Sequence, residues 1–332
     1  LVSGPSEALS FERAGPRARL AFEPRKTRAG IVTCGGLCPG INDVVRRLSL
    51  QLLLSYGVRE VIGFRYGFEG MTARGLAPIV LTPEVVRHIH RIGGSMLGTS
   101  RGRQDTGELV STLADSSIDV LFTIGGNGTL RAAHDIAKEI EAQGLAIGVV
   151  AIPKTIDDDI ALIDESFGFR TAIQHARTAI DAAHVEATGA RNGVGVVKLM
   201  GRDAGFISAR ATIASAEANF CLLPEYPFAI EGPGGLLAAL RKRLERRGHA
   251  VIVAAEGCGA RLADRNAERD ASGNLRYASA SLDFGPFLCN VIKRHFEEAG
   301  VPLTLKYIDP SYTIRAAPAN AADAVYCAEL AR

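Results

Sequence analysis

The sequence predicts an α/β fold of two doubly wound domains with mainly parallel sheets and the functional site in the cleft between them. Short β-branched runs alternate with segments of helical periodicity, which is the pattern of βαβ units. The runs Ala146–Ile152 and Ala250–Ala255 are apolar, as expected of parallel strands buried on both faces. A chain of 332 residues contains too many of these units for one small domain.

Seven short runs predict the strands. In chain order they are Gly30–Cys34, Glu60–Phe64, Asp119–Ile124, Ala146–Ile152, Gly195–Leu199, Ala250–Ala255 and Leu303–Tyr307. Eight longer segments predict the helices that connect them. They are Pro39–Leu54, Pro83–Arg91, Leu130–Gln143, Gly168–Ala187, Ala204–Ala218, Gly234–Arg247, Phe284–Ala299 and Asn320–Ala331. We place the domain boundary near Asp157–Phe167, and residues 1–28 are predicted to form a polar N-terminal arm.

Composition excludes several classes of function. Charged residues are 22% of the chain and the net charge is +2, which argues against a nucleic-acid-binding protein. The basic clusters at residues 241–243 and 246–247 are predicted to be a solvated helix face. No apolar run is long enough for a membrane span, and the N-terminus lacks the apolar core of a signal peptide. The six scattered cysteines form no zinc motif and indicate a reducing compartment, so we expect a cytoplasmic protein, with a glycosome or another organelle as the alternative.

Two glycine-rich turns each follow a predicted strand. Gly35 and Gly36 open the first turn, and Gly125–Thr129 forms the second, with the amide of Asn127 inside it. Glycine lets backbone N–H groups approach an anion, and a following helix N-terminus favours negative charge. Glycines at such turns also serve tight packing, so each turn alone is a weak signal. Neither turn matches the P-loop or the dinucleotide-binding pattern.

Paired acids follow the fourth predicted strand. In an extended stretch Asp157 and Asp159, two residues apart, would point to the same face. One carboxylate could then accept a proton from a hydroxyl while the other binds metal or tunes the first. Acids in loops also cap helices, and that alternative stays open here. The neighbouring Lys154 could meet phosphate oxygens or pair with these acids.

Further charged residues lie at the ends of apolar runs. Arg101 ends a glycine- and hydroxyl-rich segment and could reach a phosphate. Lys198 and Arg202 flank the end of one predicted strand, and Glu256 follows another. A charge at the end of a buried strand either belongs to the functional site at that edge of the sheet or is simply solvated where the strand leaves the core.

Seven segments in order resemble the 6-phosphofructokinase family, and most closely the group shared by trypanosomatids, plants and some bacteria. The segments are GGLCPGIN, GGSMLGTSRG, GGNGT, PKTIDDD, KLMGRDAGF, AEG at residues 255–257, and KYIDPSYTIRAAPA. The resemblance covers the chain from about Phe11. It implies transfer of the γ-phosphoryl group of ATP, with Mg²⁺, to the 1-hydroxyl of fructose 6-phosphate in a homotetramer, with neither nucleic acid nor membrane as a partner.

The resemblance also implies roles for individual residues. Asp157 matches the catalytic base and Asp159 the second acid, with Thr155, Lys154 and Arg202 beside them in the catalytic set. The sugar-phosphate site is matched by Thr155, Asp157, Asp159, Met200, Gly201, Arg202, Glu256 and Arg315, and more weakly by Lys198 and Tyr312. The phosphoryl-donor site is matched by Gly35, Gly36, Arg101, Gly125, Gly126, Asn127, Gly128 and Thr129. Residues 29–164, rejoined by 318–332, would form the donor domain, and residues 165–317 the fructose 6-phosphate domain.

The sequence departs from the family pattern in three places. Asn127 replaces the aspartate that holds magnesium, which predicts a weakened metal position, and Asp158 replaces an asparagine. Family members continue beyond the segment at which this chain ends, so we expect a longer native protein. The resemblance implies that Gly128 favours ATP, because pyrophosphate-dependent members carry an aspartate there. Lys154 is the residue of the pyrophosphate-dependent members, but the ATP-dependent members of the trypanosomatid-like group carry it too. A pyrophosphate-dependent enzyme and a catalytically weakened sugar-phosphate-binding paralogue remain the alternatives.

Overall fold

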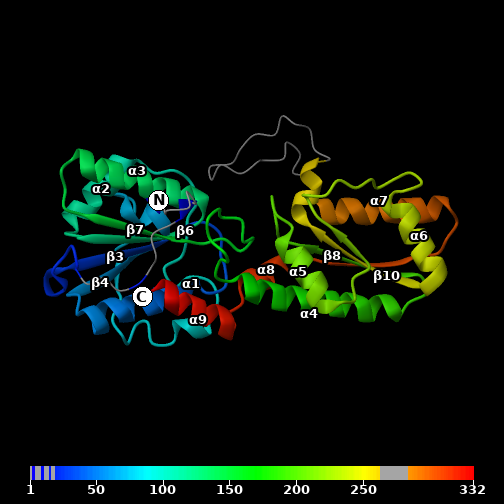
Figure 1. Ribbon diagram of the computed structural model, residues 1–332, viewed down its shortest axis with the longest axis horizontal. Coiled ribbons are helices and arrows are strands. Elements are labelled where there is room, and N and C mark those ends of the chain that lie inside the picture. The colour runs from blue at the N-terminus through cyan, green and yellow to red at the C-terminus, as the bar shows by residue number, and fades with distance from the viewer. Residues whose placement is uncertain (1, 4–8, 11–14, 16–18, 262–282) are drawn as a thin grey trace.

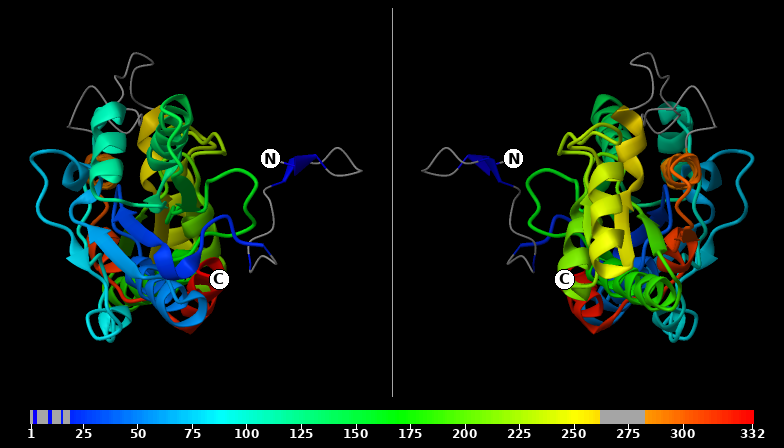
Figure 2. Two further views of the ribbon diagram at one scale, coloured as in Figure 1. Left: turned by 90° about the vertical axis from the view of Figure 1, so that its left-hand side faces the viewer. Right: turned by 90° about the vertical axis from the view of Figure 1, so that its right-hand side faces the viewer.

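The computed structural model describes residues 2–3, 9–10, 15, 19–261 and 283–332, and these residues form two lobes side by side (Figure 1). Within the predicted N-terminal arm, residues 1, 4–8, 11–14 and 16–18 lie outside the described residues. Within it, β1 (Val2–Ser3) and β2 (Leu9–Ser10) pair antiparallel and stand apart from both lobes (Figure 2). No described helix has the length and apolarity needed to cross a membrane.

The first lobe is built on a five-stranded sheet in the order β5-β4-β3-β6-β7. Its strands are β3 (Arg28–Thr33), β4 (Glu60–Phe64), β5 (Ile79–Val80), β6 (Val120–Gly125) and β7 (Gly148–Pro153), and only the pairing of β5 with β4 is antiparallel. Helices α2 (Thr106–Asp115) and α3 (Asn127–Ala142) cover one face. Helices α1 (Ile41–Leu50) and α9 (Ala321–Leu330) cover the other (Figure 1).

The second lobe is built on a parallel sheet in the order β11-β8-β10-β9. Its strands are β8 (Gly193–Leu199), β9 (Phe220–Leu222), β10 (His249–Ala255) and β11 (Thr304–Ile308). Helices α4 (Phe169–Thr188) and α5 (Phe206–Ser215) share an apolar core with one face. Helices α6 (Leu236–Arg247) and α7 (Phe284–Glu298) share a core with the other face, and the short α8 (Ser311–Arg315) follows β11.

The predicted α/β class with mainly parallel sheets is confirmed. All seven predicted strands are present with ends shifted by up to two residues, because continuous apolar runs are a strong signal in a buried sheet. The predicted helix at 83–91 is wrong, since this segment forms turns and only Ile89–Arg91 is a short 3₁₀ helix. The predicted helix at 39–54 is an α-helix only over Ile41–Leu50 and continues as a π-helical turn over Gln51–Tyr56.

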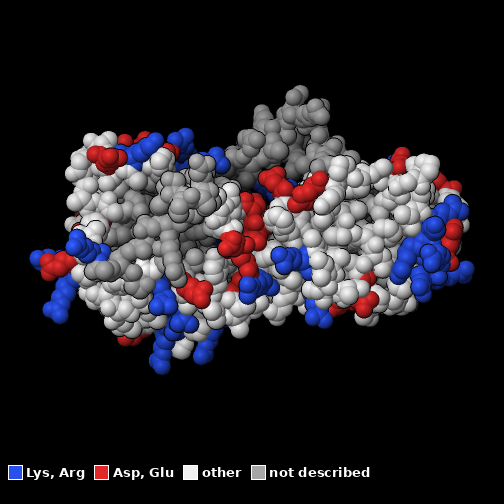
Figure 3. Space-filling model, viewed as in Figure 1, with Lys and Arg blue, Asp and Glu red and all other residues white. Residues whose placement is uncertain are grey.

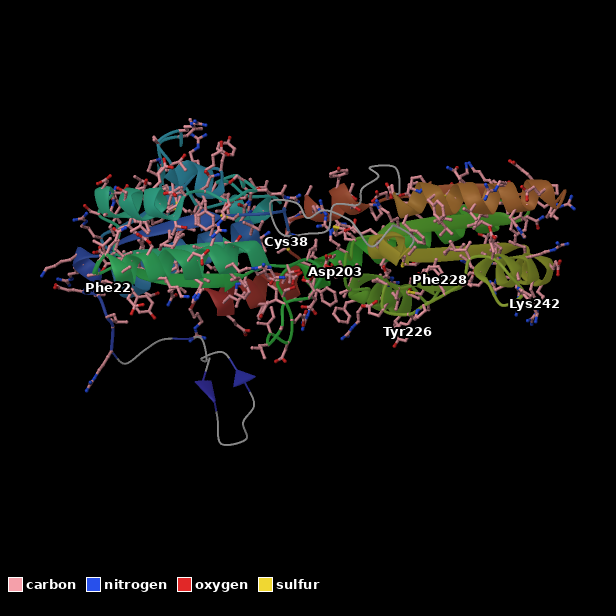
Figure 4. All side chains as sticks on the ribbon, turned by 90° about the horizontal axis from the view of Figure 1, so that it is seen from above. Phe22, Cys38, Asp203, Tyr226, Phe228 and Lys242 are labelled. Atoms are coloured by element: carbon pink, nitrogen blue, oxygen red, sulfur yellow. The ribbon has the colours of Figure 1, made fainter. Side chains whose placement is uncertain are left out.

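Two α-helices, α2 and α8, and two strands of the lobes, β5 and β9, were not predicted from the sequence. A signal for α2 was available, because Asp105 is a typical N-cap residue, and its side chain accepts a hydrogen bond from the Glu108 N–H at 2.8 Å. The predicted solvated face of α6 is confirmed. Lys242 and its basic neighbours lie at the outer end of the second lobe, where Figure 3 shows a group of cationic atoms (Figures 3 and 4).

Helix α9 returns the chain to the first lobe. Cys327 and Ala331 are buried in the same apolar cluster as Ile41 and Val45 of α1. Gly40 makes this contact possible: its φ is +98°, and a Cβ there would lie 2.9 Å from Cys327 Sγ and 3.0 Å from Phe167. The last described helix therefore packs beside the first one, although most of the sequence separates them.

Candidate active site

A cleft of about 550 Å³ lies between the two lobes, at the carboxyl ends of strands from both sheets. Its walls include both glycine-rich turns and the segment after β7 from the first lobe. Arg202, Asp203, Glu256 and Arg315 contribute from the second lobe. Figure 4 shows Cys38 and Asp203 near the junction, one from each lobe. This is the position where parallel α/β folds bind ligands.

The two glycine-rich turns form the first-lobe wall. Gly35 has φ +82°, and its N–H donates to the Ser100 carbonyl at 3.0 Å, which ties the turn to the loop that carries Arg101. A Cβ on Gly125 would lie 2.2 Å from Thr129 Oγ1, so only glycine fits beneath the second turn. Helix α3 starts at Asn127 without a side-chain cap, which leaves its positive N-terminus directed at the cleft.

Lys154 is a buried residue that makes hydrogen bonds to both glycine-rich turns. It follows β7, and only 5% of its surface is exposed. Its ammonium donates to the Gly36 carbonyl, and its backbone N–H donates to the Gly125 carbonyl at 2.9 Å. Burial lowers the pKa of Lys154, while the neighbouring Cys38 and Cys34 thiols act in the opposite direction. We infer that Lys154 both braces the turns and supplies positive charge to this wall.

The acidic segment is not the extended stretch that the sequence predicted. Asp158 has a left-handed backbone with φ +60°, and its Oδ1 accepts from the Ser166 N–H at 2.6 Å. This turn directs Asp158 toward Ser166 while Asp157 and Asp159 both line the cleft. The expected pairing of the two acids therefore arises from a turn, because Asp tolerates the left-handed region better than most residues.

Asp157 lies where the two lobes meet. Its N–H donates to Thr155 Oγ1 at 3.1 Å, and its Oδ2 accepts from the Arg202 N–H at 3.4 Å. Its Oδ1 is buried and has no hydrogen-bond partner within the described residues. Burial, then the carboxylates of Glu256 and Asp159, raise the pKa of Asp157 to about 7. A carboxyl group with a pKa close to neutrality and a free oxygen suits general acid–base chemistry.

Two arginines form the cationic part of the second-lobe wall. Arg202 and Arg315 are both half-buried and line the cleft. Arg315 Nε donates to the sulfur of the buried Met200 at 3.2 Å, which fixes its side chain. A Cβ on Gly257 would lie 1.8 Å from the Arg202 carbonyl, so the loops after β8 and β10 are in close contact. A guanidinium group that is held in place like that of Arg315 recognises phosphate with defined geometry.

The structure brings most of the predicted site residues together. Those that line the cleft are Gly35, Gly36, Arg101, Gly126, Asn127, Gly128, Thr129, Lys154, Thr155, Asp157, Asp159, Arg202, Glu256 and Arg315. Gly125 and Met200 are buried behind this lining, and Gly201, with φ +125°, forms the turn before Arg202. Tyr312 does not line the cleft and is 81% exposed.

Lys198 is also placed away from the cleft lining. It is buried at the end of β8, and its ammonium pairs with Asp309 at 2.8 Å and with Asp283 at 3.2 Å. Burial alone would lower the pKa of Lys198, but the bonds to Asp309 and the nearby charges raise it overall. This position connects the start of α7 to the segment before α8 rather than to the cleft.

Sequence reasoning overlooked one wall of the cleft. Phe68, Leu109, Ala132 and Ile136 contribute an apolar part, with Gln104 and Thr106 beside them. Three of these residues, Gln104, Thr106 and Leu109, come from α2 and its preceding loop. This helix was not predicted, and the N-cap residue Asp105 was the available signal. An apolar wall beside a phosphate-binding turn fits a ligand that carries a ring as well as phosphates.

The oxygen donors in the cleft fit a magnesium ion held mainly by bound phosphates. Asn127 offers an exposed amide, and Asp159 offers a carboxylate whose Oδ1 accepts from Thr155 Oγ1 at 2.5 Å. Among the described residues, no group of three or more His, Cys, Asp or Glu side chains could hold a metal by itself. Magnesium commonly uses one or two protein oxygens together with phosphates and water.

Comparison with known proteins identifies a consistent set of relatives. The family model "Phosphofructokinase" matches residues 28–332. The ATP-dependent 6-phosphofructokinase of Amycolatopsis methanolica is 49% identical over 333 residues, with 98% of this chain and 72% of that protein covered. The corresponding protein of Trypanosoma cruzi is 46% identical over 326 residues, with 97% of this chain and 66% of that protein covered.

Solved structures agree on the fold. A pyrophosphate-dependent phosphofructokinase from Marinobacter aquaeolei has a TM-score of 0.73 at 20% identity, with 91% of this chain and 73% of that chain covered. The phosphofructokinase from Saccharomyces cerevisiae has a TM-score of 0.75 at 18% identity, with 95% of this chain and 39% of that chain covered. At such identities these structures show the architecture and not the choice of substrate.

Proposed function

Because the chain belongs to the phosphofructokinase family, we propose that it transfers the γ-phosphoryl group of ATP to the 1-hydroxyl of fructose 6-phosphate. The product is fructose 1,6-bisphosphate, which places the enzyme in glycolysis. The observation that carries this proposal is the position of Asp157, which has an unpaired Oδ1 and lines the cleft between an anion-binding wall and a pair of arginines. A coupled assay of fructose 6-phosphate with ATP or with pyrophosphate, with and without magnesium, tests it.

The proposed mechanism relies on positioning and charge. Arg202 and Arg315 bind the sugar 6-phosphate, which directs the 1-hydroxyl toward Asp157. The Asp157 carboxylate accepts the proton of that hydroxyl as the hydroxyl oxygen attacks the γ-phosphorus of ATP in line, while the bond from this phosphorus to the bridging oxygen breaks and ADP leaves with that oxygen. The α3 N-terminus, Arg101 and Lys154 stabilise the charge on the donor phosphates. Holding both substrates in one cleft makes the transfer effectively unimolecular.

Magnesium is the proposed cofactor, and Asn127 is the residue that would contact the ion or a water in its shell. When bound, the ion neutralises charge on the donor phosphates. The amide of Asn127 brings an oxygen ligand without negative charge. We therefore propose a site that binds nucleotide normally but requires more magnesium than a site with an aspartate at this position.

The apolar wall supports ATP as the phosphoryl donor. Pyrophosphate has no apolar part, so Phe68 and Ala132 would have no contact with it, whereas a nucleotide base would pack there. Gly128 is exposed at the start of α3 and carries no side chain that would fill this space. The relatives named above at 46–49% identity are called ATP-dependent. Lys154 is the feature that favours pyrophosphate, and its bond to Gly36 gives it a bracing role with either donor.

Replacing Gly128 by Asp should reduce kcat/KM for ATP far more than for pyrophosphate. The new carboxylate would enter the cleft beside the donor and repel the additional phosphate of the nucleotide. Initial rates with each donor at saturating fructose 6-phosphate measure the effect, with Gly128→Ala as the control for added volume without charge. A wild-type protein that already prefers pyrophosphate would contradict the donor assignment.

Replacing Asn127 by Asp should lower the magnesium concentration that gives half-maximal rate and raise kcat at limiting metal. Asn and Asp have nearly the same shape, so the turn around Gly126 and Gly128 should persist while the metal position gains a charge. A magnesium titration of both proteins at fixed ATP measures this change. Superimposable titration curves would mean that residue 127 does not touch the metal shell.

We also propose the domain division that the resemblance implies. Residues 29–164 with 318–332 would form the donor domain, supported by the packing of α9 against α1, and residues 165–317 the fructose 6-phosphate domain.

We propose that the protein is a homotetramer in the cytoplasm. Exposed apolar side chains support contact between copies, since Val185 is 67% exposed on α4 and Ile213 is 77% exposed on α5.

A further inference from the structure

Residues 155–168, called the catalytic loop below, join β7 to α4 and carry Asp157. The loop lies between the lobes, and Ile156 packs against the apolar cores of both. Helix α9 contacts α1 and also the N-terminal part of α4, just beyond the loop. Two α9 side chains, Asp323 and Tyr326, make hydrogen bonds on either side of the turn at Gly168.

Asp323 caps a helix to which it does not belong. Only 1% of its surface is exposed, and its Oδ2 accepts from the Thr171 N–H at 2.7 Å and from Thr171 Oγ1 at 2.5 Å. Helix α4 starts at Phe169, and its own N-cap residue, Gly168, offers no side chain. A carboxylate at a helix N-terminus satisfies an otherwise unpaired N–H and meets the positive end of the helix dipole. The α4 N-terminus is therefore fixed by α9.

Tyr326 holds the loop on the other side of the turn. Its hydroxyl donates to the Glu165 carbonyl at 2.8 Å. The next residue, Ser166, donates through Oγ to the Thr155 carbonyl at 2.5 Å, and Thr155 Oγ1 accepts from the Asp157 N–H at 3.1 Å. A continuous path of hydrogen bonds and covalent bonds thus leads from α9 to the backbone of Asp157.

We propose that Asp323 and Tyr326 are positioning residues that hold Asp157 in its reactive orientation from outside the cleft. This inference rests on the proposed function, in which Asp157 accepts the proton of the sugar hydroxyl. Neither residue lines the cleft, so neither would touch a substrate. Loss of the anchor should therefore reduce the chemical step and leave substrate binding nearly unchanged, because small displacements of a reactive group strongly reduce rate.

The test uses the full chain with Asp323→Asn, Tyr326→Phe, Thr171→Val and Thr171→Ser. Glu329→Gln serves as the matched control, since Glu329 is an exposed acid on the same helix. We expect kcat to fall roughly tenfold in Asp323→Asn and Thr171→Val, with both KM values within about twofold. Thr171→Ser keeps the hydroxyl and should retain nearly full activity. Tyr326→Phe should show a smaller loss, and Glu329→Gln none.

Hydrogen exchange of the loop amides provides a readout that is independent of turnover. Residues 155–168 should exchange faster in Asp323→Asn and Tyr326→Phe than in wild type or Glu329→Gln. Unchanged exchange, or a lower melting temperature with kcat per folded molecule unchanged, would overturn the proposal. If Asp323→Asn does not fold, the comparison of Thr171→Val with Thr171→Ser and the result for Tyr326→Phe decide whether the proposal holds. A wild-type protein with no fructose 6-phosphate kinase activity would refute the proposed function, while the exchange data still decide whether α9 anchors the loop.

Discussion

Replacing Asp157 by Asn is expected to lower kcat by roughly 10²–10⁴, the usual effect of losing a positioned general base. The KM for fructose 6-phosphate should stay within a few fold, because Arg202 and Arg315 remain in place. The amide has nearly the shape of the carboxylate, and its single oxygen, placed where Oδ2 of Asp157 lies, can still accept the hydrogen bond from the Arg202 N–H. Steady-state rates with ATP and fructose 6-phosphate measure this effect, and near-normal turnover would remove Asp157 from the mechanism.

The thermal stability of the same variant serves as its control. Because the pKa of Asp157 is raised to about 7 from an ordinary value of 3.8, the folded protein holds a proton that the unfolded chain releases between these pH values. The folded state therefore loses stability as pH rises through this window, and a neutral Asn avoids that loss. Asp157→Asn should melt at a higher temperature than wild type at pH 8, and this difference should shrink toward pH 4. A variant that is less stable at pH 8 would point to structural damage.

Replacing Arg202 or Arg315 by Ala should raise the KM for fructose 6-phosphate by more than tenfold and leave the KM for ATP nearly unchanged. The sugar 6-phosphate is a dianion that needs paired cations, and the Arg315 guanidinium is already held in place, so it loses little rotational freedom on binding. Met200 fixes Arg315 through its sulfur, and the contact with the Gly257 loop fixes the Arg202 backbone.

Two further substitutions make this experiment specific. Arg315→Lys keeps the charge but loses the planar fork, and its KM for fructose 6-phosphate should fall between those of wild type and Arg315→Ala. Arg294→Ala removes an exposed arginine of α7 that does not line the cleft, and it should behave as wild type. Equal increases in both KM values for Arg202→Ala or Arg315→Ala would indicate misfolding or a role on the donor side.

The sequence by itself determined the layered α/β class and nearly all of the sheet. Continuous apolar runs such as Ala250–Ala255 have few alternatives to a buried parallel strand, since both of their faces must leave water. The glycine-rich turns were also predictable, because the conformations at Gly35 and the close contact at Gly125 require residues without side chains. The turns at residues 83–91 were not predictable from the sequence. Local helical periodicity there is overridden by the surrounding structure, and only Ile89–Arg91 becomes helical.

Only the tertiary structure decided which side chains face the cleft and what holds them. Asp158 turns away toward Ser166, Lys198 is used in a buried ion pair with Asp309, and Asp323 caps a helix that begins far earlier in the chain. Each of these contacts joins segments whose separation in sequence gives no local pattern. The spacing of residue types in a sequence indicates only which residues are neighbours along the chain, whereas burial and hydrogen bonding depend on which residues are neighbours in space. Residue types therefore predicted the chemistry of the site, and the packing of the two lobes around residues 155–168 determined its geometry.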